Sequence, residues 1–373
     1  MGDIREVSLR IEDAEIDNGK VWFFACDFNG LFSKNIDDGK VEFWGSIPGE
    51  EMEHIRLYSA IKKYENKIFL IPNKAKELAI FDIGAKCCTK INLDEGIGYS
   101  GHIQYMSVAQ HEDWLYLWGL TRPIIVRLNV YTYEIEMVKD LEAELKQLGY
   151  KREKLYFRKQ IEVMDGKIYA PLSTINALVE LDCDTLQIQI HALGEKKEGY
   201  AGICKGGNNE FCLTPMYYSG DIVLWNKESG SIKRILPIQG QEEFAYVAAC
   251  ALMGKYVLFP ALHCAPIYDK KSQLEIAEGN YLFAKQDQNL IIAYENNKGT
   301  ICIFDQEGNK REIDTQVSVE YTREIQMIWN ARSTEKRGVT LEFFLDVIQR
   351  QRRNEINMDE QGTTGEKIYS ILK

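Results

Sequence analysis

Two histidines in similar local sequences are the first candidates for chemistry. His54 stands in EHIRLY, and His102 stands in GHIQY, 48 residues later. Imidazole titrates near neutral pH, so two histidines brought together could serve as general acid and base. Neutral imidazoles also bind metal ions, but apart from the adjacent pair His263-Cys264 no carboxylate or cysteine has ligand-like spacing. The sequence therefore predicts His54 and His102 as catalytic candidates, with neither a metal nor another cofactor.

Cationic and aromatic residues stand near these histidines and at equivalent places further along the chain. A guanidinium matches a carboxylate or oxyanion bidentately, and Tyr and Arg are favoured at binding hot spots. The predicted ligand-binding residues are Arg56, Tyr58, Gln104, Arg158, Lys159, Tyr200, Tyr246 and His263. An alternative stays open, in which these side chains line a channel and are satisfied by water and backbone.

Motifs of nucleophilic catalysis and nucleotide binding are missing from the sequence. It contains no G-x-S-x-G, no G-x-G-x-x-G and no G-x-x-x-x-G-K-[ST]. His111 and His191 fall on a turn and on an outer strand of the expected fold, so both are predicted to be surface residues. These observations favour a binding module over an enzyme without deciding between them.

The elements that must position these residues form an internal repeat. Short polar turns precede apolar runs seven times, and their third members are separated by 47, 47, 53, 43, 45 and 34 residues. These third members are Lys20, Lys67, Trp114, Lys167, Glu210, Lys255 and Asn289. Regular spacing of this kind indicates a repeat architecture.

Each unit contains four short runs with the character of β-strands. One short run precedes the turn, two runs rich in β-branched and aromatic residues follow it, and a more polar run ends the unit. Hydrophobicity that falls toward the last strand is typical of a β-propeller blade. The predicted fold is all-β, a seven-bladed β-propeller, with six or eight blades or a many-stranded β-sandwich as alternatives.

The unit is clearest in DGKIYAPLSTINALVELDCDTLQIQI, residues 165–190. This pattern resembles kelch-type and YVTN-type bacterial propeller repeats, and the resemblance covers roughly residues 5–314. It implies the propeller fold and says almost nothing about function. In such blades, the segment leading into each innermost strand shares a face with the loop between the second and third strands. The candidate residues are therefore expected around the mouth of the central channel, the default ligand site.

Two segments depart from the repeat. Leucines at helical spacing predict a helix inserted at 139–155 within a propeller domain of residues 1–316. A C-terminal extension, 317–373, is predicted to contain helices near 339–354 and 365–373. Ring closure is assigned to EVSLRI (6–11) as a strand completing the last blade, with VSVEY (317–321) as the competing segment.

Composition limits the partners and the compartment. The formal net charge of −11 disfavours nucleic acid, which needs a basic surface. No apolar leader and no stretch of 18 apolar residues is visible, so neither secretion nor a membrane span is expected. Nine scattered cysteines suit reduced thiols. We therefore expect a cytoplasmic recognition or scaffold module for a protein, peptide or polar small molecule. The alternative is a lyase, hydrolase or isomerase using the same face, and the oligomeric state stays open.

Overall fold

The structure of the chain is a computed structural model. It describes residues 6–318 apart from 52–53, 149–155, 195–198, 208, 217–220, 239–245, 253, 262–267 and 288. The chain divides into two compact units. One is Leu9–Thr315, and the other comprises Met1–Ser8 and Gln316–Lys373. In the second unit, β1 (Glu6–Ser8) pairs antiparallel with β29 (Gln316–Ser318). The helices predicted at 339–354 and 365–373 lie outside the described residues.

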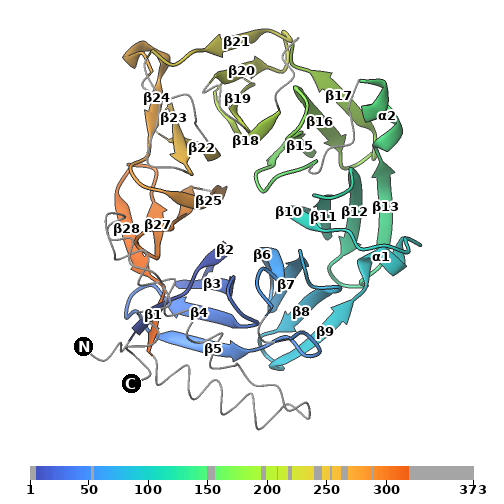
Figure 1. Ribbon diagram of the computed structural model, residues 1–373, viewed down its shortest axis with the longest axis vertical. Coiled ribbons are helices and arrows are strands. Elements are labelled where there is room, and N and C mark those ends of the chain that lie inside the picture. The colour runs from blue at the N-terminus through green and yellow to red at the C-terminus, as the bar shows by residue number, and fades with distance from the viewer. Residues whose placement is uncertain are drawn as a thin grey trace, which may run out of the picture. The chain divides into compact units, whose positions relative to one another are not determined.

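The unit Leu9–Thr315 is a seven-bladed β-propeller (Figure 1). Each blade is formed by consecutive strands, with the first strand nearest the centre of the ring and the last at its rim. The strands, blade by blade, are β2 (Ile11–Asp17), β3 (Lys20–Ala25), β4 (Leu31–Asn35), β5 (Val41–Gly45); β6 (Tyr58–Tyr64), β7 (Lys67–Pro72), β8 (Leu78–Asp82), β9 (Cys87–Ile91); β10 (Tyr105–His111), β11 (Trp114–Gly119), β12 (Ile124–Asn129), β13 (Ile135–Asp140); β14 (Glu162–Met164), β15 (Lys167–Pro171), β16 (Ala177–Asp182), β17 (Ile188–Ala192); β18 (Tyr200–Lys205), β19 (Glu210–Pro215), β20 (Ile222–Asn226), β21 (Ile232–Ile235); β22 (Tyr246–Leu252), β23 (Lys255–Pro260), β24 (Leu274–Ile276); β25 (Tyr281–Asp287), β26 (Leu290–Glu295), β27 (Thr300–Phe304), β28 (Lys310–Asp314).

The repeated polar turns are tight hairpins between the first two strands of a blade. Asn18-Gly19 joins β2 to β3 with φ of 48° and 73°, and Asp165-Gly166 joins β14 to β15 with φ of 51° and 70°. Two-residue loops with positive φ at both positions twist in the same sense as the strands they join. The turn residues thus set the hairpin register that repeats around the ring.

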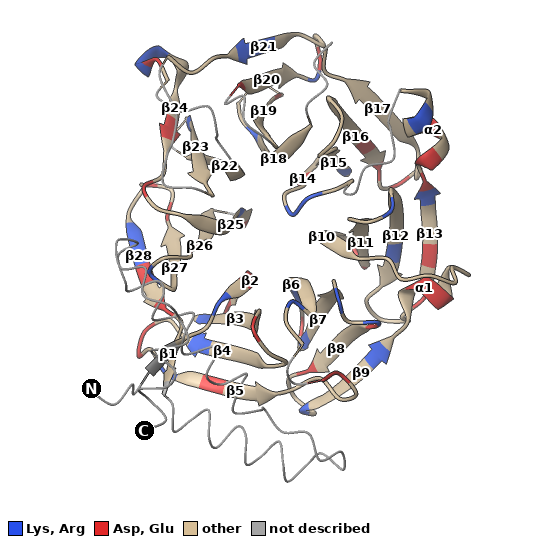
Figure 2. Ribbon diagram, viewed as in Figure 1, with Lys and Arg blue, Asp and Glu red and all other residues tan. Residues whose placement is uncertain are grey.

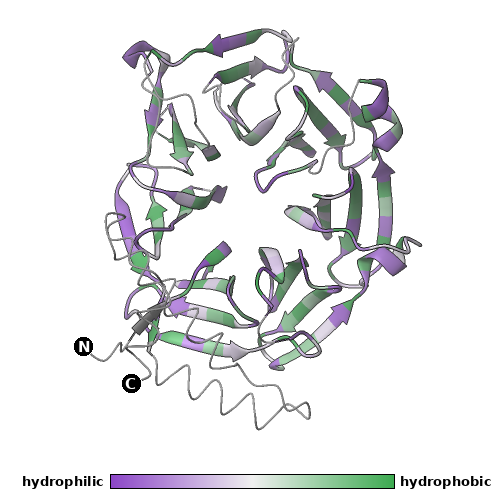
Figure 3. Cartoon of the chain, viewed as in Figure 1, coloured by the Kyte–Doolittle hydropathy of each residue, from purple (hydrophilic) through white to green (hydrophobic). Residues whose placement is uncertain are grey.

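Apolar residues of the second and third strands pack between neighbouring blades. Figure 3 shows hydrophobic residues gathered in these middle strands and more hydrophilic residues toward the rim. One such core combines Phe69 of the second blade with Leu117 and Val126 of the third, all fully buried. Because each blade covers the apolar face of the next, the closed ring buries a continuous core.

Tyrosine recurs as the first residue of five inner strands. Each of these tyrosines is at most 3% exposed, and each is followed by a shift in register of the β-bulge type. They are Tyr58, Tyr105, Tyr200, Tyr246 and Tyr281. A bulge re-aims the strand that contains it, so this position starts the inner strand with a buried aromatic ring. The recurring tyrosine is therefore part of the core between blades.

The ring closes through side chains and a backbone contact, not through a shared strand. All four strands of the last blade lie within 281–314, so the expectation that EVSLRI (6–11) completes it is wrong. Residues of EVSLRI and VSVEY instead pair with each other as β1 and β29. Within the propeller, Leu9 donates its amide to the Thr315 carbonyl at 3.0 Å, and Tyr294 donates its hydroxyl to the Leu9 carbonyl at 2.9 Å. The Lys34 ammonium reaches Asp314 at 2.7 Å.

The sixth blade departs from the others in its third strand. β24 pairs parallel with β23, after a short 3-10 turn at Lys270–Ser272. The interval from Tyr246 to Tyr281 is 35 residues, compared with 46 from Tyr200 to Tyr246. A shorter segment leaves less chain for a second hairpin in this blade.

Two short helices lie in the described residues, at the rim of the ring. The helix α1 (Leu93–Gly96) is capped by the Asn92 side chain, and α2 (Glu142–Gln147) lies inside the range where an inserted helix is predicted. Leu141 and Leu145 are buried at α2, whereas Leu148 is about half exposed. No helix among the described residues has the length and apolarity needed to cross a membrane.

Candidate functional site

A cavity of about 410 Å³ lies at the centre of the ring. Residues of β2, β6, β10, β14 and β25, together with Lys159–Ile161 before β14, line it. Its walls combine lysines, carboxylates and glutamines with small apolar side chains, and Figure 2 shows basic residues at β6 and in the loop that leads into β14. A concave site with a few charged groups among apolar neighbours is the usual form of a ligand pocket.

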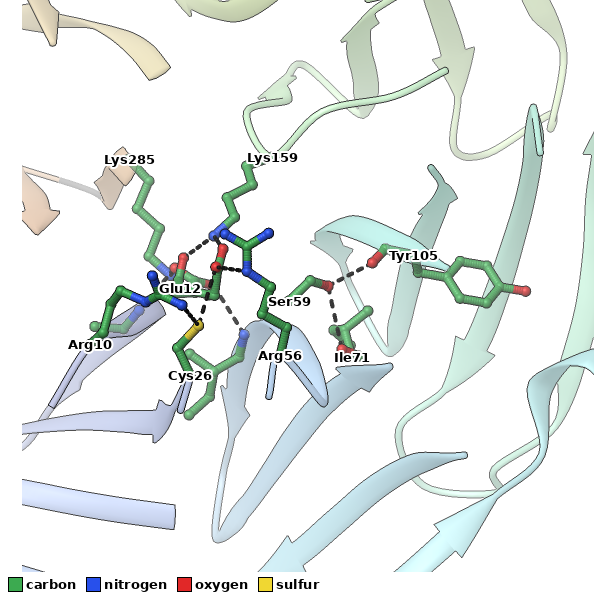
Figure 4. A network of polar contacts seen from close by, with 12 residues as sticks. Arg10, Glu12, Cys26, Arg56, Ser59, Ile71, Tyr105, Lys159 and Lys285 are labelled. Carbon is green, nitrogen blue, oxygen red and sulfur yellow. Dashed lines mark hydrogen bonds and ion pairs between the residues drawn. The ribbon is translucent and has the colours of Figure 1, made fainter. Parts of the chain in front are cut away.

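Glu12 is the meeting point of two cations beside this cavity (Figure 4). Lys159 Nζ lies 2.6 Å from Glu12 Oε2, and Arg56 Nε lies 3.3 Å from Glu12 Oε1. The Glu12 side chain is 13% exposed. Burial alone would raise its pKa, but Lys159 and Arg56 reverse this effect and lower the pKa of Glu12 to about 2. Three blades thus contribute one ionised carboxylate and two cations to the same place.

Arg56 is held by its backbone in an uncommon conformation. Its φ is +58°, in the left-handed region that side chains other than Gly rarely adopt. The Arg56 amide donates to the Cys26 carbonyl at 2.7 Å, and its carbonyl accepts from the Lys74 amide at 3.2 Å. The side chain is 48% exposed beyond its contact with Glu12. Strained conformations that the surrounding structure enforces often occur at functional sites.

A second ion pair adjoins Glu12 on the first blade. Arg10 Nη2 lies 3.3 Å from Asp27 Oδ1 and also contacts the thiol of Cys26 at 3.5 Å. The thiol in turn donates to Glu12 Oε1 at 3.4 Å (Figure 4). Burial, followed by the negative charge of Glu12, raises the pKa of the Cys26 thiol to about 12. Cys26 is therefore protonated and serves as a hydrogen-bond donor, not as a nucleophile.

A balanced chain of four charges runs across the innermost strands. Lys285 Nζ of β25 lies 2.9 Å from both Asp13 Oδ1 and Glu15 Oε2 of β2, and Glu15 Oε1 accepts from Lys62 of β6 at 2.5 Å. Burial alone would raise the pKa of Glu15, but Lys285 and Lys62 lower it. Two lysines and two carboxylates therefore neutralise one another while linking the seventh, first and second blades.

Two further carboxyl groups line the cavity outside that chain. Glu162 of β14 and Asp287 of β25 are half-buried, and neither forms an ion pair with any residue that the structure describes. Burial raises the pKa of Glu162 to about 7, against the opposing effect of Lys205. Burial, together with the negative charge of Glu15, also raises the pKa of Asp287. Within the described part of the chain, these two acidic groups of the cavity are therefore not neutralised by an ion pair.

Gln160 forms hydrogen bonds to two neighbouring blades at the cavity wall. Its Oε1 accepts from the amides of Ile203 and Ala249, each at 3.0 Å, and its Nε2 donates to the Ala249 carbonyl. Gly202 lies against this amide, where a Cβ would come within 2.4 Å of Gln160 Oε1. The side chain next to Lys159 thus joins the fourth, fifth and sixth blades.

The two histidines predicted as a catalytic pair each have partners of their own. His54 is exposed and lies 3.1 Å from Glu51. His102 Nε2 lies 2.9 Å from the Asn73 carbonyl, and its Nδ1 lies 3.4 Å from Asp94. The hydrogen bond with Asp94 raises the pKa of His102. Asp94 also accepts from the Ile103 amide at 3.0 Å, so His102 belongs to a local network that holds the segment before β10.

Of the predicted ligand-binding residues, Arg56 and Lys159 are brought together on Glu12. Tyr58, Tyr200 and Tyr246 lie in the core between blades, where Tyr246 contacts the Tyr268 hydroxyl at 3.0 Å and Tyr200 donates to Asn176. The remaining three are Gln104 and Arg158, which are half-buried, and His263, which lies outside the described residues.

His111 and His191 are half-buried, not surface residues. His111 lies 3.6 Å from Asp184, across the boundary between the third and fourth blades. His191 lies 2.8 Å from Glu180 within the fourth blade, and its ring contacts Trp225 of the fifth. Both therefore take part in packing between blades.

Sequence reasoning missed the acidic side of the site. Glu12, Asp13 and Glu15 lie on one inner strand whose sequence, IEDAEID, contains four acidic residues among seven. The strand was predicted to lie at the centre of the ring, so its high density of acidic residues could have indicated that they belong to the site. Among the described residues, no group of three or more His, Cys, Asp or Glu side chains is arranged to hold a metal ion.

Comparisons with known proteins match this chain by fold. No family model matches it, and no curated protein matches its sequence. The computationally designed Ika8 protein shares 14% identity at a TM-score of 0.53, over 82% of this chain and 87% of that one. Virginiamycin B lyase from Staphylococcus aureus shares 12% identity at a TM-score of 0.52, over 83% of this chain and 87% of that one.

A third similar structure belongs to a larger protein. It is the extracellular domain of a hybrid two component system from Bacteroides thetaiotaomicron, with 11% identity and a TM-score of 0.53 over 84% of this chain and 39% of that one. At such identities the comparisons establish the propeller fold, which hosts many unrelated functions.

Proposed function

We propose that this propeller is a recognition module that binds a peptide or polar small molecule through an anionic group at the mouth of its central channel. The observation that carries the proposal is the convergence of Arg56 and Lys159 on Glu12. Two cations from different blades share one carboxylate there, so the trio has a net positive charge beside a cavity of about 410 Å³. A carboxylate or phosphate group offers that charge its complement.

The geometry leaves Arg56 able to bind a second anion besides Glu12. The guanidinium contacts Glu12 through Nε, and about half of the side chain is exposed. A planar guanidinium can bind a second anion through its outer edge without losing the first contact. Because the backbone holds Arg56 in a fixed conformation, little ordering of the chain opposes binding.

Lys159 offers the second contact, from the opposite side. It precedes β14 of the fourth blade and spans the channel mouth to Glu12 of the first, with its ammonium 5.7 Å from the Phe283 ring centre of the seventh. Because Lys159 reaches across the channel, it can contact a ligand bound between these blades.

A cytoplasmic location is also part of the proposal. All eight cysteines in the described part of the chain are unpaired, which suits a reducing compartment.

Titration calorimetry with hexanoate, inorganic phosphate and neutral hexanamide tests the proposed function. We expect at least one of the two anions to bind the wild-type protein, and hexanamide not to bind. The variant Arg56→Gln should weaken that binding about tenfold or more, the loss of one charge-assisted contact. The matched control is Arg311→Gln, which removes an exposed guanidinium on the outer strand β28. Equal affinities of the two variants, or no binding of either anion, would overturn the proposal.

A further inference from the structure

The distribution of charge along the channel specifies the ligand more closely. Resting on the proposed function, we infer that the ligand is zwitterionic: its anionic group binds at Arg56 and Lys159, and a primary ammonium group enters the cavity beside Glu162 and Asp287. The chemical class is that of an ω-amino acid or the extended end of a short peptide. The inference depends on an excess of positive charge at Arg56 and Lys159 beside the cavity and on two acidic groups without an ion pair in its lining.

The mouth has an excess of positive charge. Among the described residues, the ion pairs at this place join Arg10, Arg56 and Lys159 to Glu12 and Asp27. Three cations thus share two carboxylates, and the pKa of Glu12 is low enough for it to stay ionised. One negative charge is needed to balance this cluster.

The cavity has an excess of acidic groups. Its two lysines other than Lys159 are Lys62 and Lys285, and both are already paired with Asp13 and Glu15. Glu162 and Asp287 are left facing the same space. An ammonium group has three donors, so it can contact one of these carboxyl groups together with neighbouring amide oxygens. Gln110 and Gln286 in the cavity wall offer such oxygens.

The two charged places are separated by a length that a small linear molecule spans. Glu162 follows Lys159 by three residues, so their Cα atoms lie at most roughly 10 Å apart. The cavity lining also includes the apolar residues Ile161, Ala109 and Val108, which suit the methylene groups of such a ligand. The lining therefore combines a cation, carboxyl groups and apolar residues, as a linear chain with opposite terminal charges requires.

An ammonium group would also relieve the cost of burying Glu162. In the ligand-free protein this carboxyl is held partly neutral near pH 7 by its burial. A cation placed next to it favours the ionised form, so binding lowers its pKa and releases a proton. A neutral or anionic ligand group at the same position cannot form an ion pair with Glu162 or Asp287.

A matched set of linear probes tests the inference. The probes are 6-aminohexanoate, hexanoate and adipate, which share a carboxylate and differ in the opposite end. We expect 6-aminohexanoate to bind the wild-type protein about tenfold tighter than hexanoate, and adipate to bind no better than hexanoate. In the double variant Glu162→Gln/Asp287→Asn the advantage of the amino group should disappear. The matched control Glu275→Gln, on β24 outside the cavity, should preserve it.

The outcomes separate the inference from the proposed function. If hexanoate and 6-aminohexanoate bind equally and Arg56→Gln weakens both, the anion site stands and the ammonium site is wrong. Tighter binding of adipate, or an unchanged preference in the double variant, also overturns the inference. If no probe binds the wild-type protein, the inference is wrong, and the proposed function also fails unless inorganic phosphate binds. Circular dichroism and the melting temperature of each variant establish that it is folded before its affinity is compared.

Discussion

Lys159 Nζ lies 2.6 Å from Glu12 Oε2, although 147 residues separate the two in the chain. Lys159 precedes the inner strand of the fourth blade, and Glu12 lies on the inner strand of the first. The contact therefore spans the mouth of the channel and exists only after the ring has closed. It links the stability of the propeller to the site proposed for ligand binding.

Removal of Lys159 should be more costly than removal of an exposed lysine with a similar partner. The side chains of Lys159 and Glu12 are 19% and 13% exposed, whereas those of Lys255 and Glu275 are 50% and 53% exposed. We expect Lys159→Met to lower the free energy of unfolding by about 1.5–3 kcal/mol, since it leaves a buried carboxylate with less compensation. Lys255→Met should change it by about 0.5 kcal/mol or less. Urea denaturation of both variants measures this, and equal losses would contradict the prediction.

Two buried tyrosine hydroxyls should differ in their contribution to stability. The Tyr294 hydroxyl donates to the Leu9 carbonyl at 2.9 Å, whereas the Tyr58 hydroxyl has no hydrogen-bond partner among the described residues. Tyr294→Phe should lower the free energy of unfolding by about 1 kcal/mol because it leaves a carbonyl at the ring closure without this donor. Tyr58→Phe should be neutral or stabilising. Thermal and urea unfolding of the pair gives the comparison, and a larger loss for Tyr58→Phe would contradict it.

A methyl group at Gly202 should disrupt the contact among three blades. The added Cβ would lie 2.4 Å from Gln160 Oε1 and 3.0 Å from Ala248 Cα. Such overpacking typically costs about 1–3 kcal/mol, so Gly202→Ala should lower the melting temperature measurably. Gly207→Ala is the matched control because a Cβ there meets nothing within 4 Å. Equal melting temperatures for the two variants would contradict the prediction, because they would show that the Gln160 side chain can move aside without loss of stability.

The stability contribution of Glu162 should depend on pH. Its folded-state pKa of about 7 lies above its ordinary value of 4.5, so the folded protein prefers the protonated form. Wild-type stability due to this group is therefore highest below about pH 4.5 and is lost as the pH rises through about 7. The melting temperature of Glu162→Gln relative to wild type should rise between pH 5 and pH 8. A constant difference over that range would contradict the raised pKa.

Several other charged or titratable groups act on Glu162 or share its cavity. They are Lys205 and Cys204 on β18, Cys250 on β22, Lys159 before β14, Asp13 and Glu15 on β2, Lys62 on β6, and Lys285 and Asp287 on β25. Asp287 also has a raised pKa, so the same pH series on Asp287→Asn separates the two carboxyl groups. The pH dependence of the melting temperature that is still present in Asp287→Asn is attributed to Glu162.

The amino-acid sequence alone determined the repeat and the strands within it. The Asn-Gly and Asp-Gly turns and the apolar runs act over a few residues, so hairpins such as β2–β3 could be predicted, and seven such units imply the ring. Ring closure could not be predicted, because several strand-like segments near the termini compete and only the packed ends of the blades select among them. The parallel pairing of β24 in the sixth blade could not be predicted either, because it depends on neighbouring strands and not on the sequence pattern of β24 itself.

The site depended on tertiary structure for a different reason. Equivalent positions in a repeat share a place in the blade, but whether a side chain there faces the channel or the next blade is set by the strand register. Tyr58, Tyr200 and Tyr246 occupy the expected places and point into the core, because a bulge follows each of them. The cations Arg56 and Lys159 meet on Glu12 because the closed ring brings β2 close to the segments that precede β6 and β14, a relation that no local spacing encodes.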